Sequence, residues 1–516
     1  RVAGVLTYTE LDQRARTIAG FLQDRVSGAP VLLCYPSGLE FVAAFLGCFY
    51  AGALAIPAYP PRNRRHVSRI QAIAADSQAT LVLSAGPPVD EIRAWLPHSG
   101  GSGSIEVVDT QLIMADTASA WRPVTARSGD LAYLQYTSGS TSTPKGVMVS
   151  HENLLRNGDA IRDGFALHPE SLTVSWLPLF HDMGLVLTLV APVITGTPVV
   201  MMAPAAFVQR PLRWLDAVSR FRATHSGGPN FAFDLAVDRT TPSQRAQLDL
   251  SAWETSYNGS EPLRKSTLER FNEAFSISRF SPRTHVPAYG LAEATLLVTS
   301  KRATEEVQTR TLRSAALQKH RVSFAATGET GAIDIVGCGH AVLKTTVEVV
   351  DPQTCLRVPT GGVGELWVRA PGVALGYWNN PQASEDVFRA HLADNSDGPF
   401  LRTGDLGFFD DGQLYVAGRI KDVIILRGRN HYPHDIELTV QESHPLLERG
   451  NGAAFGVTEG GEERLVIVQE VSRASLRNPD VPAALTAIHE AVVAEHEVEV
   501  HEILLVAPLE VPKTSS

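Results

Sequence analysis

A loop rich in hydroxyl groups, residues 136–146, has the composition of an anion-binding site. Its glycines let a ligand approach the backbone, its hydroxyls can donate to phosphate oxygens, and Lys145 adds a cation. Apolar runs at residues 131–134 and 147–149 hold both ends of the loop, which argues against the alternative of a mobile, solvated polar loop. We therefore predict a site that suits a triphosphate. Its lining residues would be Thr137, Ser138, Gly139, Ser140, Thr141, Ser142 and Lys145.

The residue order in this loop excludes the P-loop of nucleoside triphosphatases. A P-loop ends in Gly-Lys followed by Ser or Thr and opens a helix. Here Lys145 precedes Gly146, and the apolar run that follows is typical of a strand. The triphosphate site therefore belongs to another class of protein.

Two further stretches could carry chemistry. His181 and Asp182 form a polar pair in apolar surroundings, where a histidine can serve a reacting centre or be a core or capping residue. Gly227 and Gly228 precede two phenylalanines, Phe231 and Phe233. The glycines could leave room for a ligand beside an apolar wall, or they could form a strand-to-helix turn.

The sequence Tyr-Thr-Ser-Gly-Ser-Thr-x-x-Pro-Lys-Gly at residues 136–146 resembles the signature loop of the adenylate-forming superfamily of acyl-CoA synthetases, peptide-synthetase adenylation domains and luciferases. The stretches at residues 226–232 and 427–433 look most like those of a fatty acyl-AMP ligase. The resemblance implies ATP- and Mg²⁺-dependent activation of a medium- or long-chain fatty acid to an acyl-adenylate, with release of pyrophosphate. It also implies transfer of the acyl group to a holo acyl carrier protein.

Three alternatives remain open. An acyl-CoA synthetase would form acyl-CoA readily. An amino-acid adenylation domain would need an acidic group to pair with the substrate ammonium. A nucleotide-binding protein without catalysis is disfavoured because four residues of the family site are present, namely Lys145, Glu293, Asp405 and Arg419.

The resemblance also assigns the nucleotide site. Residues 258–262 would pack against adenine, and Tyr289 would stack on the base. Glu293 and Thr141 would bind Mg²⁺, and the Asp405 carboxylate would accept from the ribose hydroxyls. Without the family, a buried structural glutamate and a turn-capping aspartate would explain Glu293 and Asp405. The full set is Asn258, Gly259, Ser260, Glu261, Pro262, Ala288, Tyr289, Gly290, Leu291, Ala292, Glu293, Asp405 and Arg419.

One residue departs from the family pattern, since many relatives have threonine where this chain has Ala292. By the same resemblance, Lys421 is the hinge about which a small domain rotates. His181 would position the substrate, because a carboxylate nucleophile needs no general base. The acyl site would comprise Trp176, His181, Asp182, Ser226, Gly227, Gly228, Pro229 and Phe231.

Length and composition agree with a soluble globular protein of more than one domain. The chain has 516 residues, 44% of them hydrophobic, so two or three domains are expected. The net charge of -10 argues against nonspecific binding of nucleic acid. The apolar stretch at residues 184–208 is interrupted by prolines and a glycine, so we expect buried helix and strand there and no membrane span. The cysteines show no CxxC spacing and predict reduced, cytoplasmic thiols: Cys34, Cys48, Cys338 and Cys355.

Helical and apolar strand-like runs alternate over residues 9–108, which predicts a doubly wound α/β fold. We expect a large N-terminal domain at residues 1–420, with doubly wound sheets and a β-rich subdomain, and a small mobile α+β domain at 421–516. Residues 301–334 match an insertion of fatty acyl-AMP ligases that is thought to restrict domain motion and disfavour CoA. The run 301–321 within it reads as polar and helix-prone.

Both ends of the sequence look cut. Residue 1 falls directly before the first element of the family fold, and Ser516 falls just short of the family's final Gly-Lys. That lysine would supply the cation for adenylate formation, and Lys513 is displaced by several residues from its place. We therefore expect the 516 residues alone to bind ATP but to form adenylate slowly.

Overall fold

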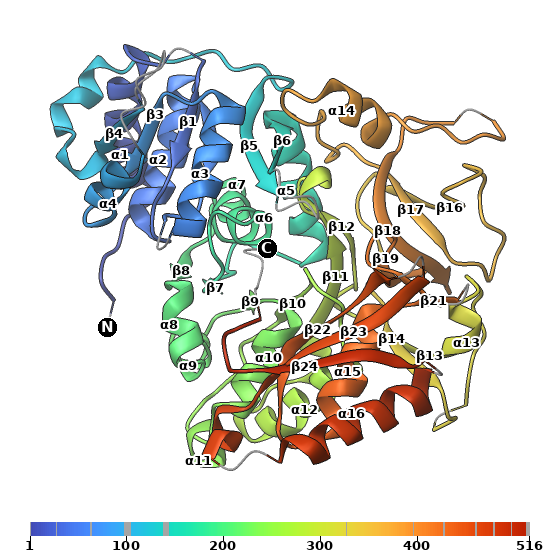
Figure 1. Cartoon of the computed structure of the whole chain (residues 1–516). Helices are drawn as coiled ribbons and strands as arrows, with labels where there is room; N and C mark the ends of the chain where they lie inside the picture. The colour runs from blue at the N-terminus through green and yellow to red at the C-terminus, as the bar shows by residue number, and fades with distance from the viewer. Residues whose placement is uncertain are drawn as a thin grey trace.

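The structure is a computed structural model, which describes residues 2–26, 28–61, 64–96, 105–137, 144–326, 328–395, 397–426, 429–459, 462–477, 480–496 and 498–511. Two mostly parallel sheets form the body, a β-rich part adjoins them, and the chain ends in a small lobe (Figure 1). The prediction of a doubly wound α/β protein with a β-rich subdomain and a small α+β part is confirmed.

The first sheet has the strand order β4-β3-β1-β2-β5-β6. Its strands are parallel except β6, which forms an antiparallel hairpin with β5. Short apolar strands such as β1 are buried because helices cover the faces of a parallel sheet. The strands are β1 (Pro30–Leu33), β2 (Leu54–Pro57), β3 (Leu81–Ser84), β4 (Glu106–Asp109), β5 (Leu131–Thr137) and β6 (Lys145–Ser150).

The helices of this part begin and end where the sequence offers caps. Thr7 and Glu10 form a reciprocal capping box at the start of α1, and Gly52 ends α2 with a left-handed backbone at φ 70°. The helices are α1 (Tyr8–Gln23), α2 (Leu39–Ala51), α3 (Arg64–Ser77) and α4 (Pro88–Trp95).

The second sheet has the order β15-β12-β11-β10-β9-β7-β8, and its strands from β8 to β11 are parallel. The strands are β7 (Thr173–Ser175), β8 (Val199–Met201), β9 (His225–Gly227), β10 (Thr255–Asn258), β11 (His285–Gly290), β12 (Leu297–Ser300) and β15 (His340–Ala341). The helices are α5 (His151–Gly164), α6 (Asp182–Leu185), α7 (Ala191–Thr195), α8 (Pro204–Gln209), α9 (Leu212–Phe221), α10 (Asn230–Asp238), α11 (Pro242–Arg245) and α12 (Lys265–Phe275), with a π-helical segment at Val186–Val190.

An antiparallel sheet of order β16-β17-β18-β19 forms the β-rich part, beside the β13-β14 hairpin. Its elements are β13 (Thr309–Arg313), α13 (Ser314–Leu317), β14 (Ala332–Val336), β16 (Thr346–Val350), β17 (Gly364–Arg369), α14 (Pro381–Phe388), β18 (Leu401–Asp410) and β19 (Gln413–Arg419). Two expectations were wrong here, one of them in part. The helix-prone run at 301–321 does contain the short helix α13, but it also contains β13, because pairing with β14 outweighs local propensity there. Asp405 lies within β18 and does not follow a tight turn.

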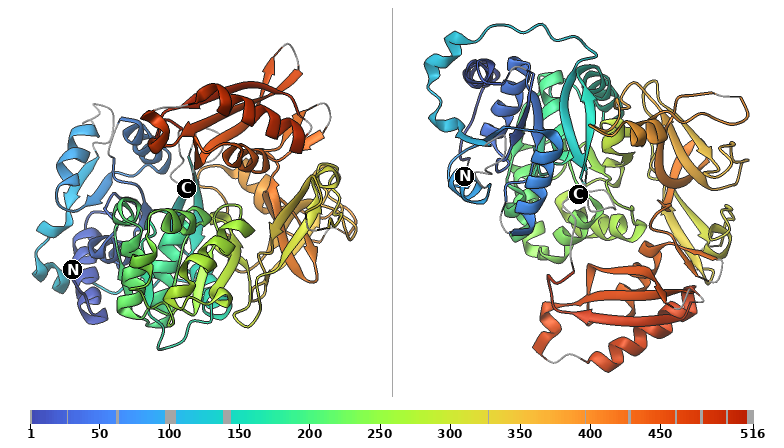
Figure 2. Two further views of the ribbon diagram at one scale, coloured as in Figure 1. Left: turned by 90° about the horizontal axis from the view of Figure 1, so that it is seen from below. Right: turned by 45° about the horizontal axis from the view of Figure 1, so that its top comes forward.

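The C-terminal lobe has a core of its own and lies beside the larger body (Figure 2). A three-stranded sheet packs against two long helices, and a short hairpin joins the lobe to the body. The elements are β20 (Ile424–Leu426), β21 (Arg429–His431), α15 (Pro433–Ser443), β22 (Leu447–Glu459), β23 (Glu462–Val471), α16 (Val481–His496) and β24 (Val500–Val506). Residues 429–431 are therefore a strand where a loop was expected.

Within the described segments, no helix is both long and apolar enough to cross a bilayer. The four cysteines are unpaired, and Cys355 is the most accessible of them.

Candidate active site

The hairpin of β5 and β6 carries the predicted phosphate loop. Thr137 and Lys145 pair across the hairpin at the points where the loop leaves and rejoins it. Five predicted phosphate contacts lie outside the described residues, namely Ser138, Gly139, Ser140, Thr141 and Ser142. The structure therefore fixes the base of this loop and the position of its lysine.

Lys145 and Glu293, far apart in sequence, meet at Tyr377. The Lys145 ammonium lies 4.9 Å from the centroid of the Tyr377 ring, and the Tyr377 hydroxyl donates to Glu293 Oε1 at 2.8 Å. The segment bearing Tyr377 pairs with β6, since the Trp378 N–H donates to the Gly146 carbonyl at 2.7 Å. Sequence reasoning missed Tyr377, and no local motif marks it. Only this pairing brings it to the site.

The electrostatics around Glu293 suit a bound cation. Burial raises the pKa of Glu293 above its usual range, and the Tyr377 hydroxyl opposes this shift. The Asp182 carboxylate also raises the pKa of Glu293. A divalent cation would relieve both costs of keeping Glu293 charged.

A second polar chain joins Tyr289 of β11, Asp405 of β18 and Arg419 of β19. The Tyr289 hydroxyl donates to Asp405 Oδ2 at 2.7 Å, and Arg419 Nε donates to Asp405 Oδ1 at 3.0 Å. Burial raises the pKa of Asp405, while Arg419 opposes that rise. Asp405 is only 5% exposed, whereas the Arg419 side chain is 68% exposed. The pair thus presents a fixed carboxylate beside an accessible guanidinium.

His181 and Asp182 form a close ion pair at the start of α6. The Nδ1 of His181 lies 2.6 Å from Asp182 Oδ1, which also accepts from the Met183 N–H at 2.6 Å. Burial alone would lower the pKa of His181, but Asp182 outweighs it and raises the pKa. For Asp182, burial alone would raise the pKa, but His181 lowers it. His181 is thus held in one orientation, and the capping alternative is also correct, because His181 is the N-cap of α6.

Asp182→Asn is expected to destabilise the protein in a pH-dependent way, because the variant removes the charge and keeps the shape. The raised pKa of His181 contributes stability that is complete below about pH 6.5 and is lost as the pH rises through the folded value. The lowered pKa of Asp182 contributes stability that is lost only in acid. The drop in melting temperature should therefore be larger at pH 5.5 than at pH 8.5. An equal drop at both pH values would contradict the ion pair.

The loop after β10 connects several parts of the site. Asn258 is fully buried, and neither polar atom of its side chain has a hydrogen-bond partner within the described ranges. Such orphaned groups are rare in proteins, and a ligand can satisfy them. Ser260 Oγ lies 3.2 Å from Met183 Sδ of α6. Glu261 of the same loop is directed to the start of α10, where its Oε1 accepts from the Phe231 N–H at 2.6 Å.

The paired glycines serve packing within the protein. A Cβ on Gly227 would collide with the backbone oxygen of Tyr257, and a Cβ on Gly228 would lie 2.5 Å from the Trp176 ring. The expectation that these glycines leave open space for a ligand was therefore wrong at both positions. They form the strand-to-helix turn between β9 and α10, with Pro229 as the N-cap of that helix.

An aromatic cluster lies directly behind this turn. The Trp176 ring stacks on the Phe207 ring with 3.9 Å between their centroids. It forms a T-shaped contact with the Phe231 ring, with 6.0 Å between centroids. Phe231 is 41% exposed, so it can face a ligand. Phe233 is fully buried against Trp214 and cannot line a pocket.

Two other predicted residues, Ser226 and Gly259, have contacts within the protein. Ser226 is fully buried, accepts from the Trp214 indole N–H at 2.7 Å and donates to the Val174 carbonyl at 2.6 Å. Gly259 lies close to the Ala288 carbonyl, and a Cβ there would be 2.9 Å from that oxygen. The Ser226 bonds thus join β9 to α9 and β7, and the close approach at Gly259 brings the ends of β10 and β11 together.

The remaining predicted residues divide into two groups. The end of β11 and the turn beyond it bear Ala288, Gly290, Leu291 and Ala292, next to Tyr289 and Glu293. Pro262 is exposed beside Glu261, and Lys421 is exposed between β19 and β20. Lys513 lies outside the described residues.

The fold and this site define a class of protein. The family model described as "AMP-binding enzyme" matches residues 3–378, and one described as "Disco-interacting protein 2-like, AMP domain" matches residues 421–516. The chain belongs to the AMP-binding enzyme family, and within it to the fatty acyl-AMP ligases.

Three similar proteins support that assignment. The medium-chain-fatty-acid–[acyl-carrier-protein] ligase JamA of Moorena producens is 45% identical over 99% of this chain and 88% of its own length. The long-chain-fatty-acid–AMP ligase FadD26 of Mycobacterium marinum is 36% identical over 100% of this chain and 90% of its own. A fatty acyl-adenylate ligase of Legionella pneumophila, solved with acyl adenylate and pyrophosphate, is 40% identical, with a TM-score of 0.79 over 99% of this chain and 89% of that chain.

Proposed function

We propose that this ligase activates a medium- or long-chain fatty acid with ATP and passes the acyl group to the phosphopantetheine thiol of a holo acyl carrier protein. The similarity to JamA over nearly the whole chain carries this proposal, because the name of that relative states both the substrate and the acceptor. The unpaired cysteines support a cytoplasmic location.

The reaction has two steps. A carboxylate oxygen of the fatty acid attacks the α-phosphorus of ATP, and the bond to pyrophosphate breaks. The thiol sulfur of the carrier then attacks the acyl carbonyl, and AMP leaves. Lys145 and the hydroxyl loop bind the phosphates. His181, which is held by its ion pair with Asp182, orients the carboxylate of the fatty acid.

Glu293, together with Thr141, is the proposed holder of Mg²⁺. Mg²⁺ prefers oxygen ligands and is commonly bound by one or two carboxylates together with substrate phosphates. The described residues contain no cluster of three or more histidine, cysteine or acidic side chains, so a site completed by phosphates fits this chain better than a protein cage. When bound, the ion would neutralise charge on the phosphates.

The adenosine part of ATP would be bound by Tyr289, Asp405 and Asn258. The two oxygens of Asp405 retain lone pairs for ribose hydroxyls beyond the bonds from Tyr289 and Arg419. Asn258 offers a donor and an acceptor that no described protein group satisfies. Acyl chains would lie against Phe231 and Trp176.

The proposed domains are residues 1–420 and 421–516, with Lys421 as the hinge between them. The second family match begins at residue 421, and the C-terminal lobe has its own core. The proposed insertion, residues 301–334, touches that lobe: Asn430 Nδ2 donates to the Gln318 carbonyl at 3.0 Å and lies 2.8 Å from His320 Nε2. These contacts would hold the lobe against rotation.

The proposal is tested by supplying the enzyme with a fatty acid, ATP and either CoA or a holo acyl carrier protein. We expect acyl-carrier product and little acyl-CoA. Asn430→Ala should raise the acyl-CoA yield by up to about thirtyfold, since two hydrogen bonds of ~1 kcal/mol each are lost. Asn395→Ala, in an exposed loop between α14 and β18, is the control. Efficient acyl-CoA synthesis by the unaltered protein would favour an acyl-CoA synthetase instead.

A further inference from the structure

The first turn of α10 donates a hydrogen bond to a distant part of the chain. The opening N–H groups of a helix have no partner within the helix, and the N-cap Pro229 provides no side-chain acceptor. The Phe231 N–H instead donates to Glu261 Oε1 at 2.6 Å. A carboxylate is favoured at this end of a helix because it also meets the positive end of the helix dipole. Glu261 thus replaces the missing local cap.

This bond fixes the residue that faces the proposed acyl site. The centroid of the Phe231 ring lies 6.0 Å from that of Trp176 and 6.5 Å from that of Phe207, but 41% of the Phe231 surface is exposed. Packing therefore holds only one side of the ring. The bond to Glu261 fixes the backbone at Phe231, from which the side chain extends. Glu261 therefore helps to set the position of the Phe231 ring.

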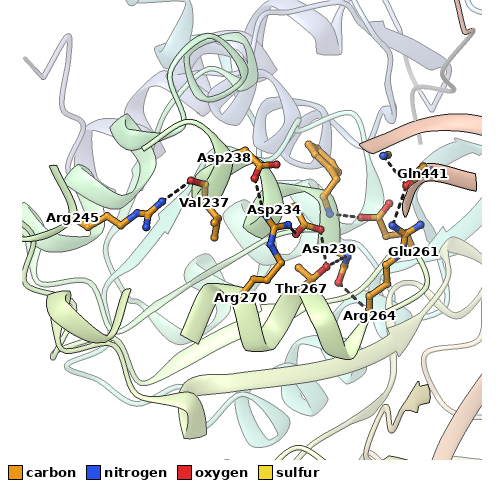
Figure 3. A network of polar contacts seen from close by, with 12 residues as sticks. Asn230, Asp234, Val237, Asp238, Arg245, Glu261, Arg264, Thr267, Arg270 and Gln441 are labelled. Atoms are coloured by element: carbon orange, nitrogen blue, oxygen red, sulfur yellow. Dashed lines mark hydrogen bonds and ion pairs between the residues drawn. The ribbon is translucent and has the colours of Figure 1, made fainter. Parts of the chain in front are cut away.

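The same stretch of chain is anchored at two further points (Figure 3). Asn230 Oδ1 accepts from the Arg264 N–H at 3.2 Å, and the Asn230 amide donates to Thr267 Oγ1 at 3.0 Å. The Arg264 guanidinium donates to Gln441 Oε1 of α15 at 3.4 Å. The segment that follows Glu261 is thus bonded to Asn230 of α10 and to Gln441 of α15.

We propose that Glu261 is a positioning residue for the acyl chain, acting through Phe231, and that it is not a nucleotide ligand as its motif suggests. This inference rests on the proposed acyl site. Its consequence is specific: losing the carboxylate should impair use of the fatty acid and leave use of ATP almost unchanged.

ATP–pyrophosphate exchange with octanoate, dodecanoate and hexadecanoate tests the inference on the full chain. Glu261→Ala should raise the KM for the best of these acids by about fivefold, the effect of losing a helix cap, with the KM for ATP changed by less than about twofold. Glu261→Gln keeps the acceptor oxygen and should restore most of the loss. Glu273→Ala, an exposed glutamate on α12, is the matched control.

The Phe231→Ala and Glu261→Ala variants distinguish a failure of the proposed acyl site from a failure of the positioning role of Glu261. Phe231→Ala should alter the KM for fatty acid and the order of preference among the three chain lengths. If it does not, the proposed acyl site is wrong. If Phe231→Ala has this effect but Glu261→Ala leaves the fatty-acid KM unchanged, or raises the KM for ATP instead, the positioning role of Glu261 is overturned. Thermal melting of each variant identifies any loss caused by unfolding.

Discussion

Glu293→Gln is expected to lower the rate of adenylate formation by ~10²–10³-fold, the usual cost of removing one preorganised electrostatic contact. Glutamine has nearly the same shape and can still accept from the Tyr377 hydroxyl. What the variant lacks is the charge that would bind Mg²⁺ beside the triphosphate. The rate should fall at every ATP concentration, and raising the Mg²⁺ concentration should recover part of it.

Tyr377→Phe is the matched control for this prediction. It removes the hydroxyl that donates to Glu293 but leaves the carboxylate and the aromatic face beneath Lys145. We expect a loss of about tenfold, typical of a residue that orients a metal ligand. If the two variants lost the same activity, with no change in Mg²⁺ dependence, Glu293 would be a structural residue. Single-turnover formation of acyl-adenylate is the appropriate measurement.

The comparison of Lys145 with Tyr377 shows what sequence can and cannot reveal. Lys145 lies in a loop whose function follows from its composition and from the two strands that flank it, and these are local properties. Tyr377 reaches the site because residues near it pair with β6, more than 200 positions earlier in the chain. Pairing between distant segments depends on the whole fold, so no local pattern indicates it.

The glycines show a different limit. Sequence correctly indicated that side chains are excluded at Gly227 and Gly228, but it could not say what occupies the space. The structure places protein atoms of Tyr257 and Trp176 there. Likewise, the polar run that contains Thr309–Arg313 reads as helix-prone by itself, but this segment of it becomes a strand because β14 lies beside it.

Asp405→Asn should have the second largest effect, a rise in the KM for ATP of about 10–100-fold. Hydrogen bonds to a charged group are worth ~1.5–3 kcal/mol, and the variant would weaken those proposed to the ribose hydroxyls. It would also remove the negative charge that pairs with Arg419 and weaken the bond from Tyr289. The turnover number at saturating ATP should fall much less, because the reacting phosphate is bound elsewhere.

Asp410→Asn provides the control for this prediction, because Asp410 lies on the same strand, β18, and pairs with Arg310 outside the site. That variant should lose some stability and leave the KM for ATP unchanged. Tyr289→Phe should raise the KM for ATP by an amount between those of the two aspartate variants. It keeps the carboxylate and the ring but removes one hydrogen bond to Asp405. Isothermal titration with AMP measures binding without turnover. Equal AMP affinities for Asp405→Asn and Asp410→Asn would show that Asp405 holds the strands together and does not bind the nucleotide.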